Sequence, residues 1–200
     1  MLPDRAAAPV LLKIVIAGGF GVGKTTMVGA VSDIPPLATE EVLTKASSAT
    51  DSLAGVESKT TTTVSMDFGR ITFPEPDPLI LYIFGTPGQD RFLFTWAELA
   101  QGAIGAVVLA DTRRLADSFT AISYFEQRRM PFLVAVNEFD GAHRYTEDEV
   151  RDALDLSDEA PVLSCNARDP QSAAAVLKHL VDYALSLAKP RLPSAPGAFL

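Results

Sequence analysis

The sequence predicts one α/β domain of three layers, in which a mostly parallel six-stranded sheet carries helices on both faces. Six short apolar runs alternate with helix-like segments, an order typical of strands joined by crossover helices. The chain has 200 residues, of which 48% are apolar, and this is enough to bury one full core. We expect residues 1–189 to form the domain and the proline-rich residues 190–200 to form a loose tail.

The elements follow one another in a regular order. Strands are expected at residues 11–17, 64–73, 79–84, 104–110, 132–137 and 161–164, and helices at residues 25–31, 95–101, 117–128, 147–154 and 171–188. The proline-rich segment 74–78 is too short for a crossover helix. The second and third strands should therefore form an antiparallel hairpin at the sheet edge. Residues 32–62 are polar and weakly periodic, which is typical of a functional or disordered loop.

Charge and composition exclude several functions. The net charge of −8 and the pI near 4.7 argue against a nucleic-acid-binding surface. Because no apolar run approaches the length of a membrane span and no signal-peptide pattern is visible, we expect a cytoplasmic protein without direct membrane insertion. Cys165, the only cysteine, is interpreted as a small buried residue. His143 and His179 lack metal-ligand spacing.

Residues 18–25, GGFGVGKT, match the phosphate-binding loop G-x-x-x-x-G-K-[ST] between the first strand and the first helix. In such a P-loop, backbone N–H groups at a helix N-terminus surround the phosphates. Lys24 would reach the outer phosphates, and the Thr25 hydroxyl would ligate Mg2+. A chance glycine turn is the alternative. The predicted phosphate-binding residues are Phe20, Gly21, Val22, Gly23, Lys24, Thr25 and Thr26.

Two polar residues at the end of the fifth strand, Asn137 and Asp140, predict selection of guanine. The Asp140 carboxylate can accept from the N1–H and N2–H2 donors of guanine, whereas adenine lacks that pair. Asn137 would brace the loop or reach the ring. A polar turn at the strand end is the alternative. After the next strand, Asn166, Ala167 and Arg168 are candidates to offer backbone N–H groups to the guanine oxygen.

In its order of motifs the chain resembles the Ras-like small GTPases over nearly its whole length. Residues 63–68, TVSMDF, resemble the end of switch I, and residues 85–92, GTPGQDRF, resemble switch II. The switch II form is similar to that of bacterial GTPases of the Mgl gliding-motility type. Residues 66–72 and 110–115 are similar to the actinobacterial GTPases encoded in conservons.

The resemblance implies a bacterial signalling switch with Mg2+ as cofactor, GTP as substrate and GDP as product. The implied partners are a roadblock-type regulatory protein and a membrane histidine-kinase-like sensor, which would recruit the protein to the inner face of the membrane. Release of residues 32–63 and 86–94 after hydrolysis would form the switch. A partner-binding patch is expected around Phe92 and Phe94, whereas Trp96 is expected to pack on the sheet.

The resemblance also implies how GTP would be hydrolysed. Gln89 is expected to orient the attacking water, next to Gly88 at the phosphates. Lys24 would stabilise the γ-phosphate charge, together with Mg2+ held by Thr25 and Thr63. Thr62 is the alternative to Thr63. Two further residues are candidate arginines for the γ-phosphate or, alternatively, surface residues: Arg70 and Arg91.

Three positions depart from the family pattern. Phe20 replaces a glycine, and its ring would slow hydrolysis or pack over the nucleotide. Gly85 replaces an aspartate that holds Mg2+ through water. Asp67 is either its substitute or a solvent-exposed residue, and we favour exposure because most aspartates are exposed. Glu138 replaces a lysine, which predicts weaker nucleotide binding, and Arg168 either compensates its charge or lies in solvent.

Three functional hypotheses remain open. Gln89 favours a slow GTPase, whereas Phe20 and Gly85 favour a nucleotide-binding scaffold that hydrolyses poorly within a membrane sensor-kinase signalling complex. An ATP-using P-loop enzyme is the third hypothesis. Asn137 and Asp140 disfavour it.

Overall fold

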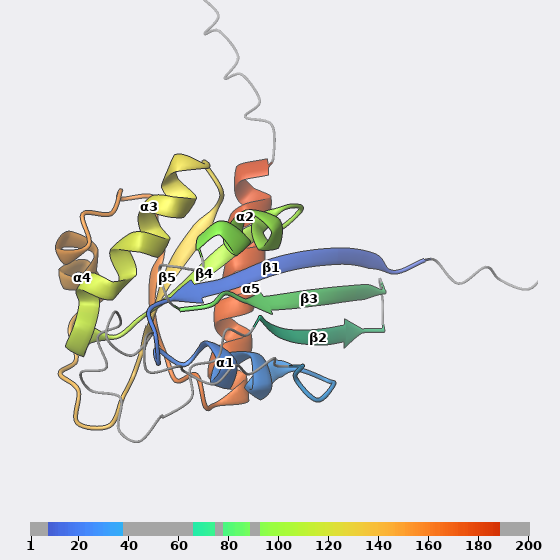
Figure 1. Ribbon diagram of the computed structural model, residues 1–200, viewed down its shortest axis with the longest axis horizontal. Coiled ribbons are helices and arrows are strands. Elements are labelled where there is room, and N and C mark those ends of the chain that lie inside the picture. The colour runs from blue at the N-terminus through green and yellow to red at the C-terminus, as the bar shows by residue number, and fades with distance from the viewer. Residues whose placement is uncertain (1–7, 38–65, 75–77, 89–92, 189–200) are drawn as a thin grey trace, which may run out of the picture.

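We analysed a computed structural model of the chain, which describes residues 8–37, 66–74, 78–88 and 93–188 (Figure 1). The expected tail at residues 190–200 and most of the expected loop at residues 32–62 lie outside this part. In chain order the elements are β1 (Val10–Gly18), α1 (Lys24–Val31), β2 (Asp67–Phe73), β3 (Leu79–Gly85), α2 (Leu93–Ala100), β4 (Gly105–Ala110), the 3-10 helix η2 (Thr112–Ser118), α3 (Phe119–Gln127), β5 (Phe132–Asn137), α4 (Glu147–Ala153), β6 (Val162–Cys165) and α5 (Pro170–Ala188).

The six strands form one sheet in the order β2-β3-β1-β4-β5-β6. All neighbouring pairs are parallel except β2 and β3, whose antiparallel register places Asp67 opposite Gly85 and Phe73 opposite Leu79. The predicted mostly parallel sheet with one antiparallel edge strand is therefore confirmed. The carboxyl ends of the parallel strands all meet at one edge, where ligands bind in open α/β sheets.

Helices cover both faces of the sheet, as predicted, with α1 and α5 on one face and α2, α3 and α4 on the other (Figure 1). Alternation along β1 sends Ile14 and Ile16 into the first core and Val15 and Ala17 into the second. Strands β4 and β5 are buried along their whole length, as expected for parallel strands covered on both faces.

The helices form where local signals favour them. On α5 the buried residues recur at helical spacing, which gives one apolar stripe toward the sheet: Ala173, Val176, Leu177, Leu180 and Ala184. A capping box between Thr146 and Glu149 begins α4. The helix expected at residues 117–128 differs, because η2 precedes α3. The backbone is not helical at Arg114, where φ is −146° and ψ is 51°.

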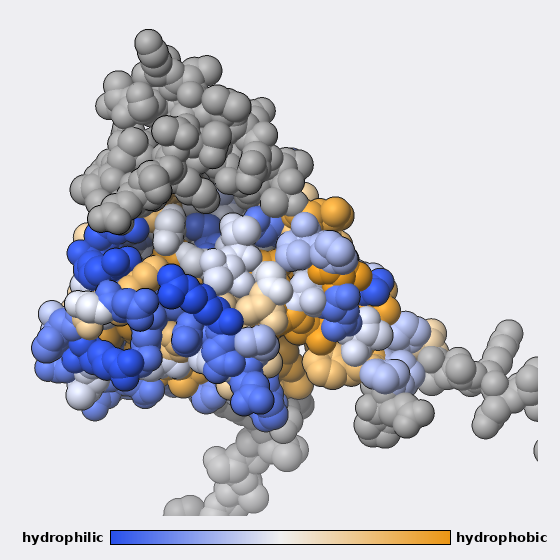
Figure 2. All heavy atoms as spheres, turned by 90° about the horizontal axis from the view of Figure 1, so that it is seen from below, coloured by the Kyte–Doolittle hydropathy of each residue, from blue (hydrophilic) through white to orange (hydrophobic). Residues whose placement is uncertain are grey.

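An apolar groove of about 700 Å³ separates α5 from the β2–β3 end of the sheet. Figure 2 shows apolar side chains gathered toward this end of the described surface. Phe73, at the end of β2, is 46% exposed there. Across the described ranges, no helix combines the length and apolar character needed to cross a bilayer.

Candidate functional site: a phosphate loop and a base loop

The phosphate loop connects β1 to α1, at the sheet edge where the parallel strands end. The φ values of the loop glycines are 136° at Gly18, 72° at Gly21 and 107° at Gly23. Residues with a Cβ rarely adopt such positive φ values, so the loop needs glycine at these positions. Among the described residues, no side chain caps the first turn of α1. The first N–H groups of the helix therefore have no side-chain cap, which is the condition for an anion to bind there.

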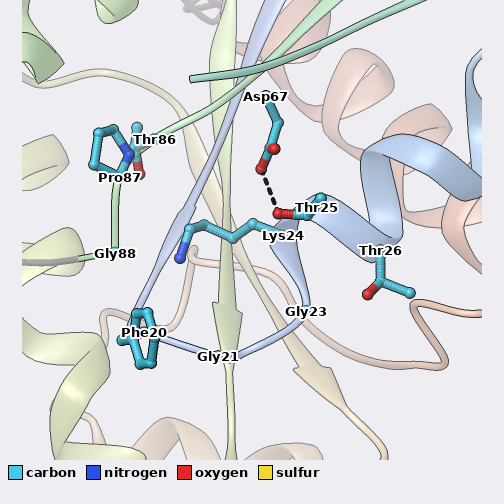
Figure 3. Close-up of a pocket in the computed structure, with 10 residues that line it drawn as sticks. All are labelled: Phe20, Gly21, Gly23, Lys24, Thr25, Thr26, Asp67, Thr86, Pro87 and Gly88. Carbon is cyan, nitrogen blue, oxygen red and sulfur yellow. Dashed lines mark hydrogen bonds between the residues drawn. The ribbon is translucent and has the colours of Figure 1, made fainter. Parts of the chain in front are cut away.

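Lys24 crosses the pocket from the start of α1. Its Nζ donates to the carbonyl oxygens of Gly18 at 2.9 Å and Gly19 at 2.7 Å. Figure 3 shows the side chain running toward Phe20 and Gly88. A Cβ on Gly88 would lie 2.9 Å from Phe20 Cα and 3.0 Å from Gly19 O, so glycine lets the loop after β3 pack closely on the phosphate loop.

The pocket brings together most of the predicted phosphate-binding residues. Its lining consists of Phe20, Gly21, Gly23, Lys24, Thr25, Thr26, Asp67, Thr86, Pro87 and Gly88 (Figure 3). Val22 differs, because its side chain is buried in the core between the sheet and α5 and only its backbone serves the site. Gln89 and Thr63, the other expected catalytic residues, lie outside the described residues, as does Thr62.

Asp67 is the acidic residue of this pocket. It is 2% exposed, and its Oδ2 accepts a hydrogen bond from Thr25 Oγ1 at 2.7 Å (Figure 3). The expectation that Asp67 lies in solvent is therefore wrong. The reason is its position at the start of the edge strand, where its side chain points over the phosphate loop instead of away from the sheet.

A buried carboxylate beside a hydroxyl is a donor set suited to Mg2+, which prefers oxygen ligands and keeps several waters. Thr86 adds a hydroxyl to the same lining that sequence reasoning missed. It is 1% exposed, and its Oγ1 has no hydrogen-bond partner within the described ranges. Among the described residues, no group of three or more His, Cys, Asp or Glu side chains is arranged to hold a metal ion. Phosphate and water would therefore have to complete the coordination of a cation here.

Asn137 ties the end of β5 to two other loops. It is 7% exposed, its Nδ2 donates to Val22 O at 2.9 Å, and its Oδ1 accepts from Ala167 N at 3.0 Å. Of its two expected roles, the structure shows the bracing one. The loop after β5 at residues 138–146, called the base loop below because it holds the candidate base-selecting Asp140, is thereby joined through one buried amide to the loop after β6 and to the phosphate loop.

Asp140 lies at the rim of the base loop, with its side chain 99% exposed and its Oδ2 3.5 Å from Arg168 Nη1. The candidate N–H donors after β6 all make bonds within the protein. Asn166 N donates to Ser172 Oγ, Ala167 N to Asn137 Oδ1 and Arg168 N to Asn166 Oδ1. These bonds fix the shape of the loop that faces Asp140.

Glu138, the departure from the expected lysine, turns toward another arginine. Its Oε2 lies 3.0 Å from Arg144 Nη2, so Arg144 and not Arg168 balances this charge. Sequence reasoning missed Arg144, which is six residues farther along the chain and in no recognisable motif. The same negative charge lies near Cys165, which is 3% exposed, as the sequence predicted for a small buried residue.

Comparison with known proteins agrees with this geometry. The chain matches, over residues 16–187, the model of a family described as conserved hypothetical ATP-binding proteins. The chain belongs to this nucleotide-binding P-loop family. It is also 28% identical over 131 residues to MJ1339, an uncharacterized protein of Methanocaldococcus jannaschii, and the match covers 64% of this chain and 71% of that protein. Neither match names a Ras-like, Mgl-type or conservon GTPase. The comparisons therefore support a nucleotide-binding P-loop protein and do not reach these finer assignments.

In this member of the P-loop family, the aromatic residues that follow β3 are divided between core and surface. Trp96 is 3% exposed, and its Nε1 donates to Pro87 O at 3.3 Å, so its predicted packing on the sheet is confirmed. Phe94 is 74% exposed. Phe92 and Arg91 lie outside the described residues. Arg70 is three positions from Asp67 on β2, so its side chain leaves the strand on the opposite face from the pocket's carboxylate.

Buried polar side chains concentrate around the two loops of this P-loop protein. Among the described residues, the buried polar or charged ones are Lys24, Asp67, Thr86, Asp111, Ser118 and Asn137. Lys24, Asp67 and Thr86 line the pocket, Asn137 bonds to the phosphate loop, and Asp111 bonds to two arginines that contact the loops. Burying polar groups is costly unless they are bonded, so their clustering here indicates that the edge is built for a charged ligand.

Proposed function

We propose that this protein is a guanine-nucleotide-binding switch that binds GTP or GDP with Mg2+ and hydrolyses GTP slowly. The observation that carries the proposal is the Asn137 bridge, which holds the base loop beside the phosphate loop. With the loop braced, the Asp140 carboxylate at its rim would accept from the paired donors of guanine. Adenine lacks this donor pair and would not gain these two hydrogen bonds.

The phosphate end supplies the groups for charge stabilisation. Phosphate oxygens would replace the carbonyls of Gly18 and Gly19 as partners of Lys24 Nζ, because a charged acceptor binds an ammonium more strongly than a neutral one. Thr25 and Asp67 would hold the Mg2+ that neutralises the phosphates, with Thr63 completing the site in the GTP form. Gln89 would orient the attacking water.

Slow hydrolysis is proposed from the position of Phe20. Its residue lines the pocket next to Gly88, whose ideal Cβ would lie 2.9 Å from Phe20 Cα. Phe20 therefore lies beside Gly88, the residue that precedes Gln89 in the sequence. It would restrict the approach of water and of an activating arginine, so that a partner is needed for efficient turnover.

We also propose that the switch acts in bacterial signalling with a roadblock-type regulatory protein and a membrane sensor of the histidine-kinase-like class. The support is the motif resemblance, together with the exposed Phe94 next to switch II. A hydrolysis-poor scaffold in the same complex remains the alternative, favoured by Phe20. ATP binding is a second candidate function, favoured by the description of the family.

Single-turnover hydrolysis of bound GTP in the presence of Mg2+ tests the proposal, with wild type beside Gln89→Leu and with competition by excess GTP or ATP. We expect slow phosphate release that depends on Gln89 and is suppressed by GTP but not by ATP. Tight guanine nucleotide binding without turnover, also after addition of the partner, would favour the scaffold. Suppression by ATP alone would overturn the guanine assignment.

A further inference from the structure

One buried carboxylate between the two nucleotide loops holds two arginines. Asp111, directly after β4, is 3% exposed. It accepts bonds from Arg113 N at 3.0 Å, Arg113 Nε at 2.9 Å and Arg113 Nη2 at 2.8 Å. Arg114 Nη2 lies 3.9 Å from the same carboxylate. The two arginines then reach different loops, so Asp111 is the common anchor of both contacts.

Arg114 holds the phosphate loop. Its side chain is 20% exposed, its Nη2 donates to Phe20 O at 2.8 Å, and its Nη1 lies 3.6 Å from Asp117 Oδ2. The helix η2 also approaches the loop closely, since a Cβ on Gly19 would lie 2.7 Å from Asp117 Cβ. A planar guanidinium can serve a carbonyl and two carboxylates together, whereas a lysine ammonium cannot span them.

The contact fixes a peptide unit that faces the pocket. In a trans peptide the C=O and the following N–H point in opposite directions. Because Arg114 holds the Phe20 carbonyl from the η2 side, the N–H of Gly21 points to the other side of the loop. Gly21 lines the pocket, so this orientation offers its N–H to a phosphate.

Arg113 reaches the base loop. Its Cζ lies 4.0 Å from the centre of the Phe139 ring. In the sequence, Phe139 stands between Asn137 and Asp140. Next to it, Thr112 Oγ1 donates to His143 O at 3.1 Å. A cation over an aromatic face is attracted to it. The ion pair of Glu138 with Arg144 stays within the base loop. The contacts of Arg113 and Thr112 attach the base loop to the segment that follows β4.

We propose that Asp111 positions both nucleotide loops, through Arg114 as the positioning residue of the phosphate loop and Arg113 as that of the base loop. The proposal deepens the proposed function and rests on the same pocket binding a nucleoside polyphosphate. It adds a division of labour. Arg114 sets the affinity for the phosphates, whichever base is present, and Arg113 sets the preference between bases.

Dissociation of fluorescent GDP and ADP tests this division. Arg114→Ala should speed the release of both nucleotides by a similar factor, about tenfold, as for the loss of one charged hydrogen bond. Arg114→Lys should recover only part of this loss. Arg113→Ala should reduce the GDP-over-ADP preference. Asp111→Asn, which keeps an oxygen for the Arg113 N–H, should show both effects. If Arg114→Ala and Arg113→Ala change affinity and preference alike, the proposed division is wrong.

A matched control comes from α4, where Arg151 has a side chain 21% exposed and an ion pair to Asp148 at 2.6 Å. Arg151→Ala removes an arginine of similar burial with the same i,i+3 pairing, but one whose ion pair is to Asp148 on α4 and not to either nucleotide loop. It should leave both dissociation rates unchanged. If it speeds release as much as Arg114→Ala does, the effect is general destabilisation and the positioning role is overturned.

Hydrogen exchange of the nucleotide-free protein gives a readout that does not depend on the ligand. Arg114→Ala should raise exchange in the phosphate loop, Arg113→Ala in the base loop, and Asp111→Asn in both. Unchanged exchange in both loops, or an equal rise across the sheet, would overturn the proposal. Wild type that prefers ADP would overturn the guanine assignment alone, because the exchange pattern tests the loops independently.

Discussion

Asp67 occupies the space that a side chain at Gly85 would need, since a Cβ on Gly85 would lie 2.9 Å from Asp67 Oδ2. The two residues are direct partners in the antiparallel register of β2 and β3. The carboxylate beside Thr25 therefore comes from β2, and the neighbouring strand is reduced to glycine to admit it. The glycine at position 85 and the burial of Asp67 are therefore one structural arrangement.

Replacing Asp67 with asparagine tests its proposed part in binding Mg2+. The amide keeps the size of the side chain but removes its charge, so Mg2+ should be held less well. In wild type, EDTA should speed the release of bound GDP. In Asp67→Asn, release in Mg2+ should already be about tenfold faster, and EDTA should add little. Asp148→Asn, an exposed carboxylate on α4, is the control, and a variant with the wild-type EDTA response would contradict the role.

Exchanging the two residues tests whether they share one space. Gly85→Asp alone should destabilise the protein by about 2 to 3 kcal/mol, because it overfills a buried site and places two carboxylates together. The double variant Asp67→Gly, Gly85→Asp should recover much of this loss. Urea denaturation of both single variants and the double variant measures the coupling. Additive effects would show that the side chains do not compete for the space.

Removing the Asn137 amide should loosen the joint between three loops. Asn137→Ala leaves the Val22 carbonyl and the Ala167 N–H without this partner, at a cost of about 2 kcal/mol of unfolding free energy. Asn137→Asp keeps an acceptor for Ala167 but sets a buried carboxylate against the Val22 carbonyl, so it should destabilise the protein at least as much as Asn137→Ala. Chemical denaturation checks the order. Equal stability of Asn137→Ala and wild type would argue against the bridge.

The fold was predictable because its signals are local. Apolar runs, glycines and the length of the segment between β2 and β3 specify strands and the hairpin without reference to distant residues. The phosphate loop and Asn137 were also accessible, since each is a motif placed at a strand end. The bracing role of Asn137 was one of two expected alternatives.

Other parts of the site depend on contacts between distant segments. Residue type alone favoured exposure for Asp67, and only its pairing with Gly85 and its bond to Thr25 show that it is buried. Arg114 lies in a short helix that periodicity does not reveal, and its partner Phe20 is 94 positions away. Such contacts follow from packing of η2 on the phosphate loop, which no local pattern encodes.

Acid should remove the contribution of Asp111 to stability. Burial pushes the pKa of Asp111 upward, but the hydrogen bonds of Arg113 and the charges of Arg113 and Arg114 outweigh it, so the pKa lies below its ordinary value. With a folded-state pKa below the unfolded value of about 3.9, the contribution is fully present above that pH. It is lost as the pH falls through the folded-state pKa.

Asp111→Asn should therefore be less stable than wild type at pH 7, and the difference should shrink as the pH drops below about 4. Thermal unfolding across this range measures it. In an Arg113→Ala background the same comparison should give a smaller pH dependence, because the main charge partner is gone. A difference that grows toward acid pH would have the wrong sign for this account.

Cys165 should be unreactive in the folded protein. Burial, and after it the negative charge of Glu138, raises the pKa of the Cys165 thiol to about 12. At pH 8 its thiolate fraction is then about a thousandfold below that of an exposed cysteine. Iodoacetamide should modify it only after unfolding in urea. Rapid labelling under native conditions would show that β6 opens or that the thiol is accessible.

Competition binding tests the central claim most directly, namely that the loop braced by Asn137 selects guanine through Asp140. Labelled GDP would be displaced in the presence of Mg2+ by unlabelled GDP or ADP, with wild type and Asp140→Asn side by side. We predict that GDP displaces the label far better than ADP on wild type, and that the preference falls sharply in the variant. Equal or better displacement by ADP on wild type would contradict the account and assign the pocket to adenine nucleotides.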